Sequence, residues 1–344
     1  PADSSVYPTI SAALDAIPMD LNEPACIYLA PGIYHEKITI NKPYLTILGT
    51  GKSNKDVVLT YDDYALAPMA DIGKLGTFRS YSVFIDTHDV TLQNLTIENA
   101  SGDSLTHGQA IALYADGDRL VIDSFRLIGH QDTLFTGPLP PKEIEPDGFI
   151  GPKQFAPRIN GRQYYKNCYI CGDIDFIFGS ATAYFENCVI ESLCHTTNVN
   201  DIQGYITAAS TPESQEYGYV FSNCKLISKD CPPNSVYLGR PWRNYAKTVF
   251  LECALGNHIH ECGFHDWKKE DARNTVLYAE YRNYPASSAD TTSNNRSLND
   301  DIHCIDGRCI PYPHRAEYVC ELDAVQAEHF SKENVLSGAD YWNP

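Results

Sequence analysis

The sequence is poor in basic residues and has no long apolar run. Its 344 residues include 26 Lys and Arg against 44 Asp and Glu, which gives a net charge of −18. Phosphate binding needs clustered Lys and Arg, so this deficit excludes a nucleic-acid partner. No apolar run approaches the length of a membrane span, and we expect no membrane partner. The chain begins at Pro1 without a signal-like apolar segment, which indicates a mature or trimmed product.

Cysteine, by contrast, is abundant. Twelve cysteines in one chain favour an oxidising compartment, and we expect a secreted, extracellular protein. Cys168 and Cys171 form a single CxxC pair without the second pair of a zinc ribbon, so we expect neither a metal nor another cofactor. Asn-x-Ser/Thr sequences at Asn94, Asn99 and Asn295 permit glycosylation.

A short strand-like phrase recurs along the chain. Each copy alternates apolar and polar residues, then carries a polar residue followed by Leu, Phe or Cys. No helical periodicity is visible between the copies, which argues against alternating strands and helices. Repeats of this kind predict a solenoid, and we expect an all-β parallel β-helix that forms one domain over 1–344. The copies are VTLQNLTI (90–97), LVIDSFRLI (120–128), QYYKNCYI (163–170), AYFENCVI (183–190), YVFSNCKLI (219–227) and TVFLECAL (248–255).

The cysteines at the repeated position test this stacking. Cys168 and Cys188 occupy the same place in consecutive phrases, 20 residues apart, which is about one coil of a solenoid. Equivalent residues on stacked strands lie about 4.8 Å apart, within the Cα separation that a disulfide accepts. We therefore expect a Cys168–Cys188 disulfide, and Cys224 and Cys253 could pair likewise. The alternative is that these are reduced core residues, which cysteine also suits.

Two short helices are expected at the ends of the solenoid. The segment 7–18 has apolar residues at helical spacing and ends at a proline, so it is predicted to cap the open end of the first coil. The segment 323–330 is predicted to form a second short helix that folds back on the coils.

Two segments interrupt the repeat. The range 138–160 is rich in proline and charge and has no strand period, so it is predicted to be a loop inserted between coils. The range around 283–320 is rich in loop-forming residues, and Cys304 and Cys309 within it could form a local disulfide.

Two aspartates occupy equivalent places in consecutive phrases. Asp132 and Asp175 each lie seven residues beyond the repeated Leu, Phe or Cys position, and the 43 residues between them equal one coil plus the insert. Stacked strands would bring both carboxylates to one face. Two nearby carboxylates do not both ionise cheaply, which favours one acid and one charged nucleophile. The alternative is a purely structural ladder of turn aspartates.

Neighbouring motifs favour a site over a ladder. Gln131 places an amide donor beside Asp132. Arg240 and Trp242 are two residues apart, so they share a face of an extended strand. A guanidinium can hold a carboxylate with two hydrogen bonds, and an indole offers a surface for a sugar ring. The alternative is a surface cation next to a core tryptophan, which the fixed geometry of Pro241 between them disfavours.

Six ordered motifs together resemble the pectin methylesterases, the carbohydrate esterases that de-esterify homogalacturonan. The resemblance covers essentially the whole chain, and it implies a right-handed parallel β-helix and a carboxylic ester hydrolase. The motifs are GIYHE (32–36), GQAIAL (108–113), GHQDTLF (129–135), GDIDFIFG (172–179), YLGRPW (237–242) and NVLSGADYW (334–342).

The resemblance assigns roles to the motif residues. It implies that Asp175 is the nucleophile and Asp132 the general acid and base, with Gln131 and Gln109 donating hydrogen bonds to the tetrahedral oxyanion. Arg240 would pair with Asp175 and keep it ionised.

Four further residues would contact substrate on the same family pattern, namely Trp242, Thr77, Phe135 and Phe178. The implied partner is the polysaccharide pectin, bound by a monomer without metal or cofactor.

The sequence also departs from the family pattern. The insert at 138–160 has no counterpart in compact members and should alter the rim of the cleft, and Phe264 stands where plant-type members usually carry Trp. Other polygalacturonate-acting β-helix enzymes are one rival, although a pectate lyase needs a calcium-binding carboxylate cluster. An inactive pectin-binding protein is another rival. It would have lost at least one of Asp132, Asp175 or Arg240, and all three are present.

Overall fold

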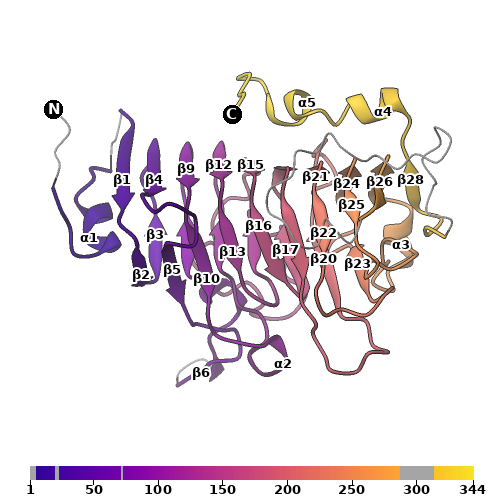
Figure 1. Ribbon diagram of the computed structural model, residues 1–344, viewed down its shortest axis with the longest axis horizontal. Helices are drawn as coiled ribbons and strands as arrows, with labels where there is room; N and C mark the ends of the chain where they lie inside the picture. Colours follow the sequence, from indigo (N-terminus) through magenta and orange to yellow (C-terminus); the bar gives the residue numbers. More distant parts are fainter. Residues whose placement is uncertain (1–4, 20–22, 71–72, 287–313) are drawn as a thin grey trace.

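The chain winds into a right-handed parallel β-helix (Figure 1). A computed structural model describes residues 5–19, 23–70, 73–286 and 314–344. Three parallel sheets run along the helix axis, and each coil contributes strands to them in turn. Sheet A contains, in spatial order, β1 (Ala25–Leu29), β4 (Leu45–Gly49), β9 (Val90–Gln93), β12 (Leu120–Asp123), β15 (Arg162–Lys166), β18 (Thr182–Glu186), β21 (Tyr219–Ser222), β24 (Lys247–Leu251), β26 (Leu277–Tyr281) and β28 (Val319–Glu321).

The other two sheets complete the wall of the coil, and their inner side chains fill one continuous apolar core. Sheet B contains β2 (Gly32–His35), β5 (Val57–Tyr61), β10 (Thr96–Asn99), β13 (Arg126–Ile128), β16 (Tyr169–Gly172), β19 (Val189–Ser192), β22 (Lys225–Ile227), β25 (Ala254–Leu255) and β27 (Tyr284–Pro285). Sheet C contains β23 (Val236–Gly239), β20 (Gly204–Ala209), β17 (Ile174–Gly179), β14 (Leu134–Thr136), β11 (Leu113–Ala115), β8 (Val83–Ile85) and β3 (Ile38–Ile40).

The remaining elements are small and peripheral. None of the described helices is long and apolar enough to cross a membrane. These elements are an antiparallel hairpin of β6 (Pro68–Met69) and β7 (Gly73–Lys74), the 3-10 helix η1 (Thr77–Arg79), and the helices α1 (Ile10–Asp15), α2 (Ser104–His107), α3 (Glu270–Arg273), α4 (Ala324–Glu328) and α5 (Lys332–Leu336).

One turn conformation explains the repeated phrase. Between the sheet A strand and the sheet B strand of a coil, the polar residue has a positive φ, which is 55° at Asn94, 54° at Asn167 and 54° at Asn187. Asparagine visits this left-handed region more readily than most residues. The following residue, such as Leu95 or Cys168, points into the core. Each phrase that was predicted as one strand is therefore two strands with a tight bend between them.

The cysteines at this position form a buried column without cross-links. The free, buried thiols are those of Cys168, Cys188, Cys224 and Cys253. Side chains at equivalent positions of parallel coils point the same way, whereas a disulfide needs its two Cβ atoms to converge. Each thiol instead approaches a carbonyl oxygen of the preceding coil, as Cys188 Sγ does at 3.5 Å from Tyr165 O. The predicted Cys168–Cys188 disulfide and the suggested Cys224–Cys253 pair are therefore wrong. Cys304 and Cys309 lie outside the described residues.

We expect alkylation of the unfolded, unreduced protein to label all four thiols of this column. In the folded protein the same thiols should resist the reagent, because burial raises the pKa of the Cys188 thiol and the thiolate is the reactive form. Peptide mapping by mass spectrometry measures both. Cys194 is exposed and free, so it is the positive control for labelling of the folded protein. Recovery of peptides joined through Cys168 and Cys188 would contradict the free column.

The two predicted capping helices are present, although each is shorter than its sequence range. In α1 the Thr9 side chain accepts a hydrogen bond from the Ala12 N–H at 3.1 Å, and Ile10 and Leu14 pack into the core. In α4 the Asp323 side chain and Gln326 cap each other, as a capping box does. The additional helix α5 was not predicted.

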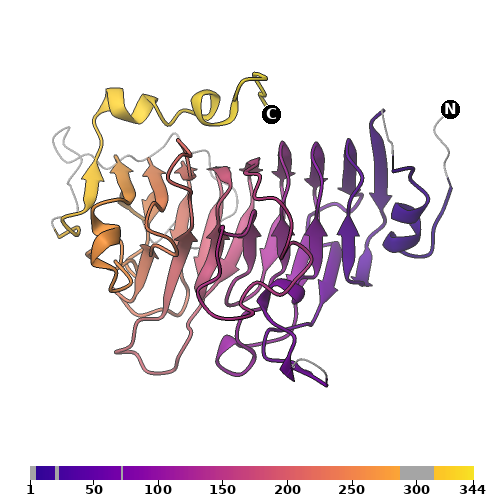
Figure 2. The ribbon, with the colours of Figure 1, turned by 180° about the vertical axis from the view of Figure 1, so that it is seen from behind.

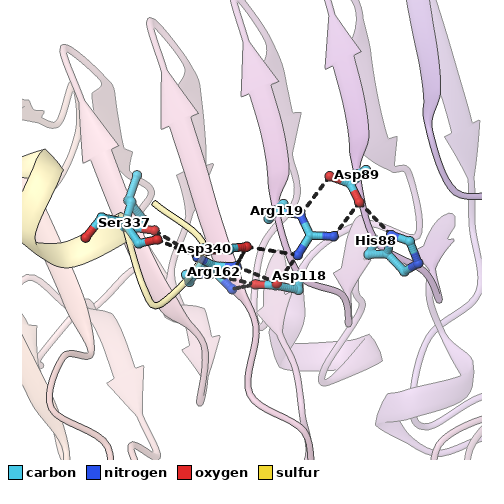
Figure 3. A network of polar contacts seen from close by, with 8 residues as sticks. His88, Asp89, Asp118, Arg119, Arg162, Ser337 and Asp340 are labelled. Atoms are coloured by element: carbon cyan, nitrogen blue, oxygen red, sulfur yellow. Dashed lines mark hydrogen bonds and ion pairs between the residues drawn. The ribbon is translucent and has the colours of Figure 1, made fainter. Parts of the chain in front are cut away.

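The C-terminal segment runs back along the β-helix from β28 toward β15 (Figure 2). Phe330 and Leu336 pack with Tyr164 and Tyr184 on the outer face of sheet A. Beyond α5, an ion-pair network ties the segment to the coil turns (Figure 3). Arg162 bridges Asp340 at 2.5 Å and Asp118 at 2.7 Å. The motif at 334–342 therefore anchors the chain end and lies on a different sheet from the catalytic motifs.

The insert at 138–160 is a loop without helix or strand, as predicted. Arg158 holds it together by donating to four of its own backbone carbonyl oxygens. Lys153 ties it to the coils through Asp86, at 2.5 Å.

Two of the glycosylation sequences have structural uses. Asn99 is buried and its amide donates to three backbone carbonyl oxygens. The Asn94 amide donates to the carbonyl oxygens of Gly49 and Gly51. In the folded protein both amide groups are therefore engaged in hydrogen bonds to the backbone. Asn295 lies outside the described residues.

Candidate active site

Asp132 and Asp175 occupy matching places on neighbouring coils. Strands β14 and β17 pair in parallel with Leu134 opposite Ile177, which sets Asp132 opposite Asp175 two residues earlier. Both aspartates have a positive φ, 66° and 50°, a conformation that costs roughly 1–2 kcal/mol for a residue with a Cβ. The register of β17 on β20 also shifts between Ile174 and Ile177. Such a bulge turns a side chain out of the regular alternation, and Asp175 sits within it.

Arg240 grips Asp175 with two hydrogen bonds. Its Nε lies 2.8 Å from Asp175 Oδ1 and its Nη2 lies 2.7 Å from Asp175 Oδ2. The guanidinium is itself held between two aromatic rings, at 3.9 Å from the centroid of Tyr205 and 3.7 Å from that of Trp267. Stacking and ion pairing together leave the guanidinium little freedom. This arrangement explains how a buried carboxylate in an apolar strand is tolerated.

The electrostatics separate the two carboxylates. Burial and the negative charge of Asp175 raise the pKa of Asp132 well above its usual range. Burial also raises the pKa of Asp175, but Arg240 opposes that rise. Asp132 is therefore the carboxyl that keeps its proton, and Asp175 is the one that ionises first.

The two glutamines of the motifs lie on adjacent coils beside these carboxylates. The Ala110 N–H donates to the Gln131 carbonyl oxygen at 3.0 Å, which brings Gln109 next to Gln131 along the sheet edge. Neither side-chain amide makes a hydrogen bond to another described residue. Both amides are half-buried and free to donate to a bound group.

An aromatic cluster lies on the same side of sheet C. The rings of Phe135 and Phe178 are 4.8 Å apart, and Phe178 is 5.6 Å from the half-buried Trp242. Phe135 is fully buried, so its predicted contact with substrate is wrong, and its role is to support the rings above it. Phe178 is also buried, at 4% exposure, which leaves Trp242 as the exposed member of this pair.

Thr77 and the insert both border this cluster. Thr77 begins η1, next to Phe78, whose ring is 5.0 Å from that of Phe135. From the insert, Phe149 packs 6.3 Å from the ring of Trp242. The insert therefore contributes to the wall beside Trp242, in line with the expected change of the cleft rim.

Several residues of this site were missed by sequence reasoning. Trp267 lies in GFHDW, in which Phe264 departs from the family pattern, yet Phe264 is a core residue stacked on Tyr278. Lys269 donates to the carbonyl oxygens of Pro241 and Trp242, and burial together with nearby Arg243 and Arg240 lowers its pKa to about 8. Tyr205 lies on β20, which pairs with both β17 and β23. No periodic signal marks Lys269, because it lies outside the strands, at the start of α3.

Known proteins share this fold. The model of the pectinesterase family matches residues 2–138 and 158–300. The chain belongs to the pectinesterase family. It is therefore a carboxylic ester hydrolase by family, and the unmatched residues 139–157 fall within the insert.

Individual pectinesterases resemble the chain to different extents. Pectinesterase 31 of Arabidopsis thaliana is 32% identical over 87% of this chain and 86% of its own length. Pectinesterase QRT1 of Arabidopsis thaliana is 31% identical over 79% of this chain, which spans 65% of that protein. A solved pectin methylesterase, in complex with a hexasaccharide, is 26% identical with a TM-score of 0.72, and the alignment covers 98% of this chain and 95% of that one.

Proposed function

We propose that this pectinesterase hydrolyses the methyl esters of galacturonate residues in homogalacturonan, releasing methanol and de-esterified pectin. The observation that carries the proposal is the pair of buried carboxylates on neighbouring coils, of which Arg240 holds only Asp175. The hexasaccharide bound to the related esterase supports a polysaccharide substrate. An inactive binding protein would not need this pair, and a pectate lyase would need calcium ligands instead.

The first half of the reaction forms a covalent intermediate. An Asp175 carboxylate oxygen attacks the ester carbonyl carbon, and the carbonyl oxygen becomes an oxyanion that accepts hydrogen bonds from Gln131 and Gln109. The bond to the methoxy oxygen then breaks. Asp132 gives its proton to that oxygen, so methanol leaves and an acyl-Asp175 anhydride remains.

The second half regenerates the enzyme. Asp132, now charged, takes a proton from a water molecule that attacks the acyl carbon of the anhydride. The bond to Asp175 breaks, which releases the galacturonate carboxyl group as the free acid and restores the ionised Asp175. The released acid then loses its proton to the solvent. Asp132 ends the cycle protonated, as its raised pKa favours.

Methanol release from highly methylated pectin is the direct test. We expect methanol together with an equal number of new carboxylates, measured by a coupled alcohol assay and by titration at constant pH. The reducing ends of the polysaccharide should not increase. Chain cleavage without methanol would instead favour a glycosidase or lyase, and binding without either product would favour an inactive binder.

Replacing Gln131 by Ala should lower kcat about 10²–10³-fold, because the oxyanion loses one preorganised donor. KM should change little, since the charge to be stabilised develops only in the transition state. Steady-state kinetics on pectin measure this split. Gln93→Ala is the matched control, because Gln93 lies in sheet A and contacts Asp123. A rise in KM with unchanged kcat would remove the oxyanion role.

We also propose that the protein acts as a secreted monomer. Its substrate is a cell-wall polysaccharide, which supports an extracellular location. The free cysteine column does not require an oxidising compartment, so this proposal rests on the substrate. Fractionation of the native source would test location, and sedimentation of the purified protein would test the oligomeric state.

A further inference from the structure

Asp173 is a buried carboxylate that the proposed mechanism does not use. Its exposed fraction is 1%, and it lies between β16 and β17, two residues before the nucleophile. The Ser104 hydroxyl donates to its Oδ2 at 2.5 Å. The Nδ1 atoms of His195 and His130 lie 3.5 Å and 3.6 Å from the same oxygen. Its Oδ1 accepts the Ile174 N–H at 2.6 Å. One carboxylate thus contacts three other segments of the chain, at Ser104, His130 and His195, besides its own neighbour Ile174.

The protons in this cluster can be assigned. Ser104 has a single hydroxyl hydrogen, which it donates to the Asp173 carboxylate. The Ser104 oxygen lies 2.9 Å from His195 Nδ1 and can only accept there, so His195 carries a proton on Nδ1. Burial by itself would raise the pKa of Asp173, but its contacts with His130, His195 and Ser104 lower it to about 2. Asp173 is therefore charged throughout the working range of an esterase.

The cluster abuts the backbone that carries both catalytic carboxylates. The Asp173 N–H donates to the His130 carbonyl oxygen at 3.3 Å, and the Asp132 N–H donates to the Ile174 carbonyl oxygen at 3.0 Å. The turn before Asp132 packs so closely that a Cβ on Gly172 would lie 2.5 Å from the His130 oxygen. The side chain of Asp173 closes this junction from outside, because it binds the Ile174 N–H and approaches the His130 ring at once.

We propose that Asp173 is a positioning residue that, with Ser104 and His195, fixes the spacing between the turn carrying Asp132 and the strand carrying Asp175. This inference rests on the function proposed above. A positioning role differs from a purely structural one in one respect. The charge of Asp173 acts on the reacting groups, so its removal should change their pKa values.

The negative charge of Asp173 should affect how kcat depends on pH. The titratable groups that face Asp173 are His130, His195 and the two catalytic aspartates. Asp103 lies beyond the histidines. Burial raises the pKa of Asp175, Arg240 and Lys269 oppose that rise, and the negative charge of Asp173 adds to it. Activity is lost as pH falls through the pKa of the nucleophile. Removing the Asp173 charge should therefore move the acid limb of kcat to lower pH.

The experiment is the kcat–pH profile of Asp173→Asn on methylated pectin. An amide of the same shape cannot accept hydrogen bonds from both Ser104 and Ile174, so the junction loosens. We expect kcat to fall about 10–100-fold, since displacements of about 1 Å carry costs of this size, with KM nearly unchanged. We also expect the acid limb to shift to lower pH.

Three variants make the test specific. Ser104→Ala keeps the Asp173 charge, so kcat should fall less and the acid limb should stay. His195→Gln removes a cation beside Asp173, so the acid limb should move to higher pH, the opposite direction. Asp116→Asn is the matched control, because Asp116 is buried near Lys153 at the other end of the sheet C strands, and its acid limb should match the wild type.

The outcomes separate the possible failures. A wild-type protein that releases no methanol would overturn the proposed function itself. An active wild type whose Asp173→Asn variant keeps the normal kcat, or loses kcat and melting temperature without a shift of the acid limb, would overturn the positioning role. If Asp173→Asn does not fold, the opposite-sign shift in His195→Gln decides the matter, and its absence rejects the proposal.

Discussion

Replacing Asp175 by Asn is expected to lower methanol release about 10⁴- to 10⁶-fold, the loss seen when a covalent nucleophile is removed. An amide oxygen cannot attack the ester and form an anhydride, so no alternative route through the same intermediate exists. The fold should survive, because Asn has the same shape and also tolerates the positive φ at this position. Steady-state release from methylated pectin measures the loss, and circular dichroism checks the fold.

The control for this variant is Asp116→Asn, which also replaces a buried aspartate in a sheet C turn but lies away from the carboxylate pair. It should retain the wild-type rate. An Asp175→Asn protein with near-native turnover would assign the nucleophile to another group. Activity could also be lost because Arg240 is left without its partner and the fold collapses. In that case the near-ultraviolet circular dichroism would be lost as well, which distinguishes a folding defect from a catalytic one.

Replacing Asp132 by Asn is expected to cost about 10²–10⁴-fold in kcat, the usual contribution of general acid–base catalysis. Both halves of the reaction suffer, because methanol leaves without a proton and water attacks without a base. The pH profile should change as well. In the wild type, activity falls as pH rises through the raised pKa of Asp132, since the acid is then lost. In the variant this alkaline limb should disappear, and kcat measured across the alkaline range checks it.

Lys269 is the competing source of an alkaline limb, because its pKa is lowered to about 8 and it lies near the nucleophile. The variant Lys269→Met separates the two groups. If the limb belongs to Asp132, it persists in Lys269→Met and vanishes in Asp132→Asn. The reverse result would move the alkaline limb to the lysine and leave the acid–base role of Asp132 without its pH evidence.

Much of the fold was readable because a solenoid repeats a local pattern. The alternation of apolar residues and the recurring Asn-Cys step report on a single coil, and the turn at Asn167 or Asn187 uses the left-handed tolerance of asparagine. The constant register between coils then placed Asp132 opposite Asp175. Each phrase was predicted as one strand but forms two. The prediction missed the bend because a bend of two residues leaves the alternation of apolar and polar residues in both strands intact.

Side-chain direction and depth were less accessible. Cys168 and Cys188 do lie on consecutive coils, yet their thiols point along parallel directions and stay reduced. Phe135 and Trp242 both read as cleft aromatics, but only the second reaches the surface. Equivalent positions in sequence say which residues stack, whereas the packing of the finished coil decides which of them are covered.

The sequence by itself determined the coil, the turn chemistry and the pairing of two aspartates, since each depends on near neighbours or on a fixed period. Tertiary structure alone decided what surrounds that pair. Tyr205 and Trp267 meet on the Arg240 guanidinium from different coils. Ser104 and His195 meet on Asp173 although they are 91 residues apart. Tyr205 is placed by the register of β20, whereas Trp267, Ser104 and His195 lie outside the strands. No period in the sequence predicts where such segments fold back.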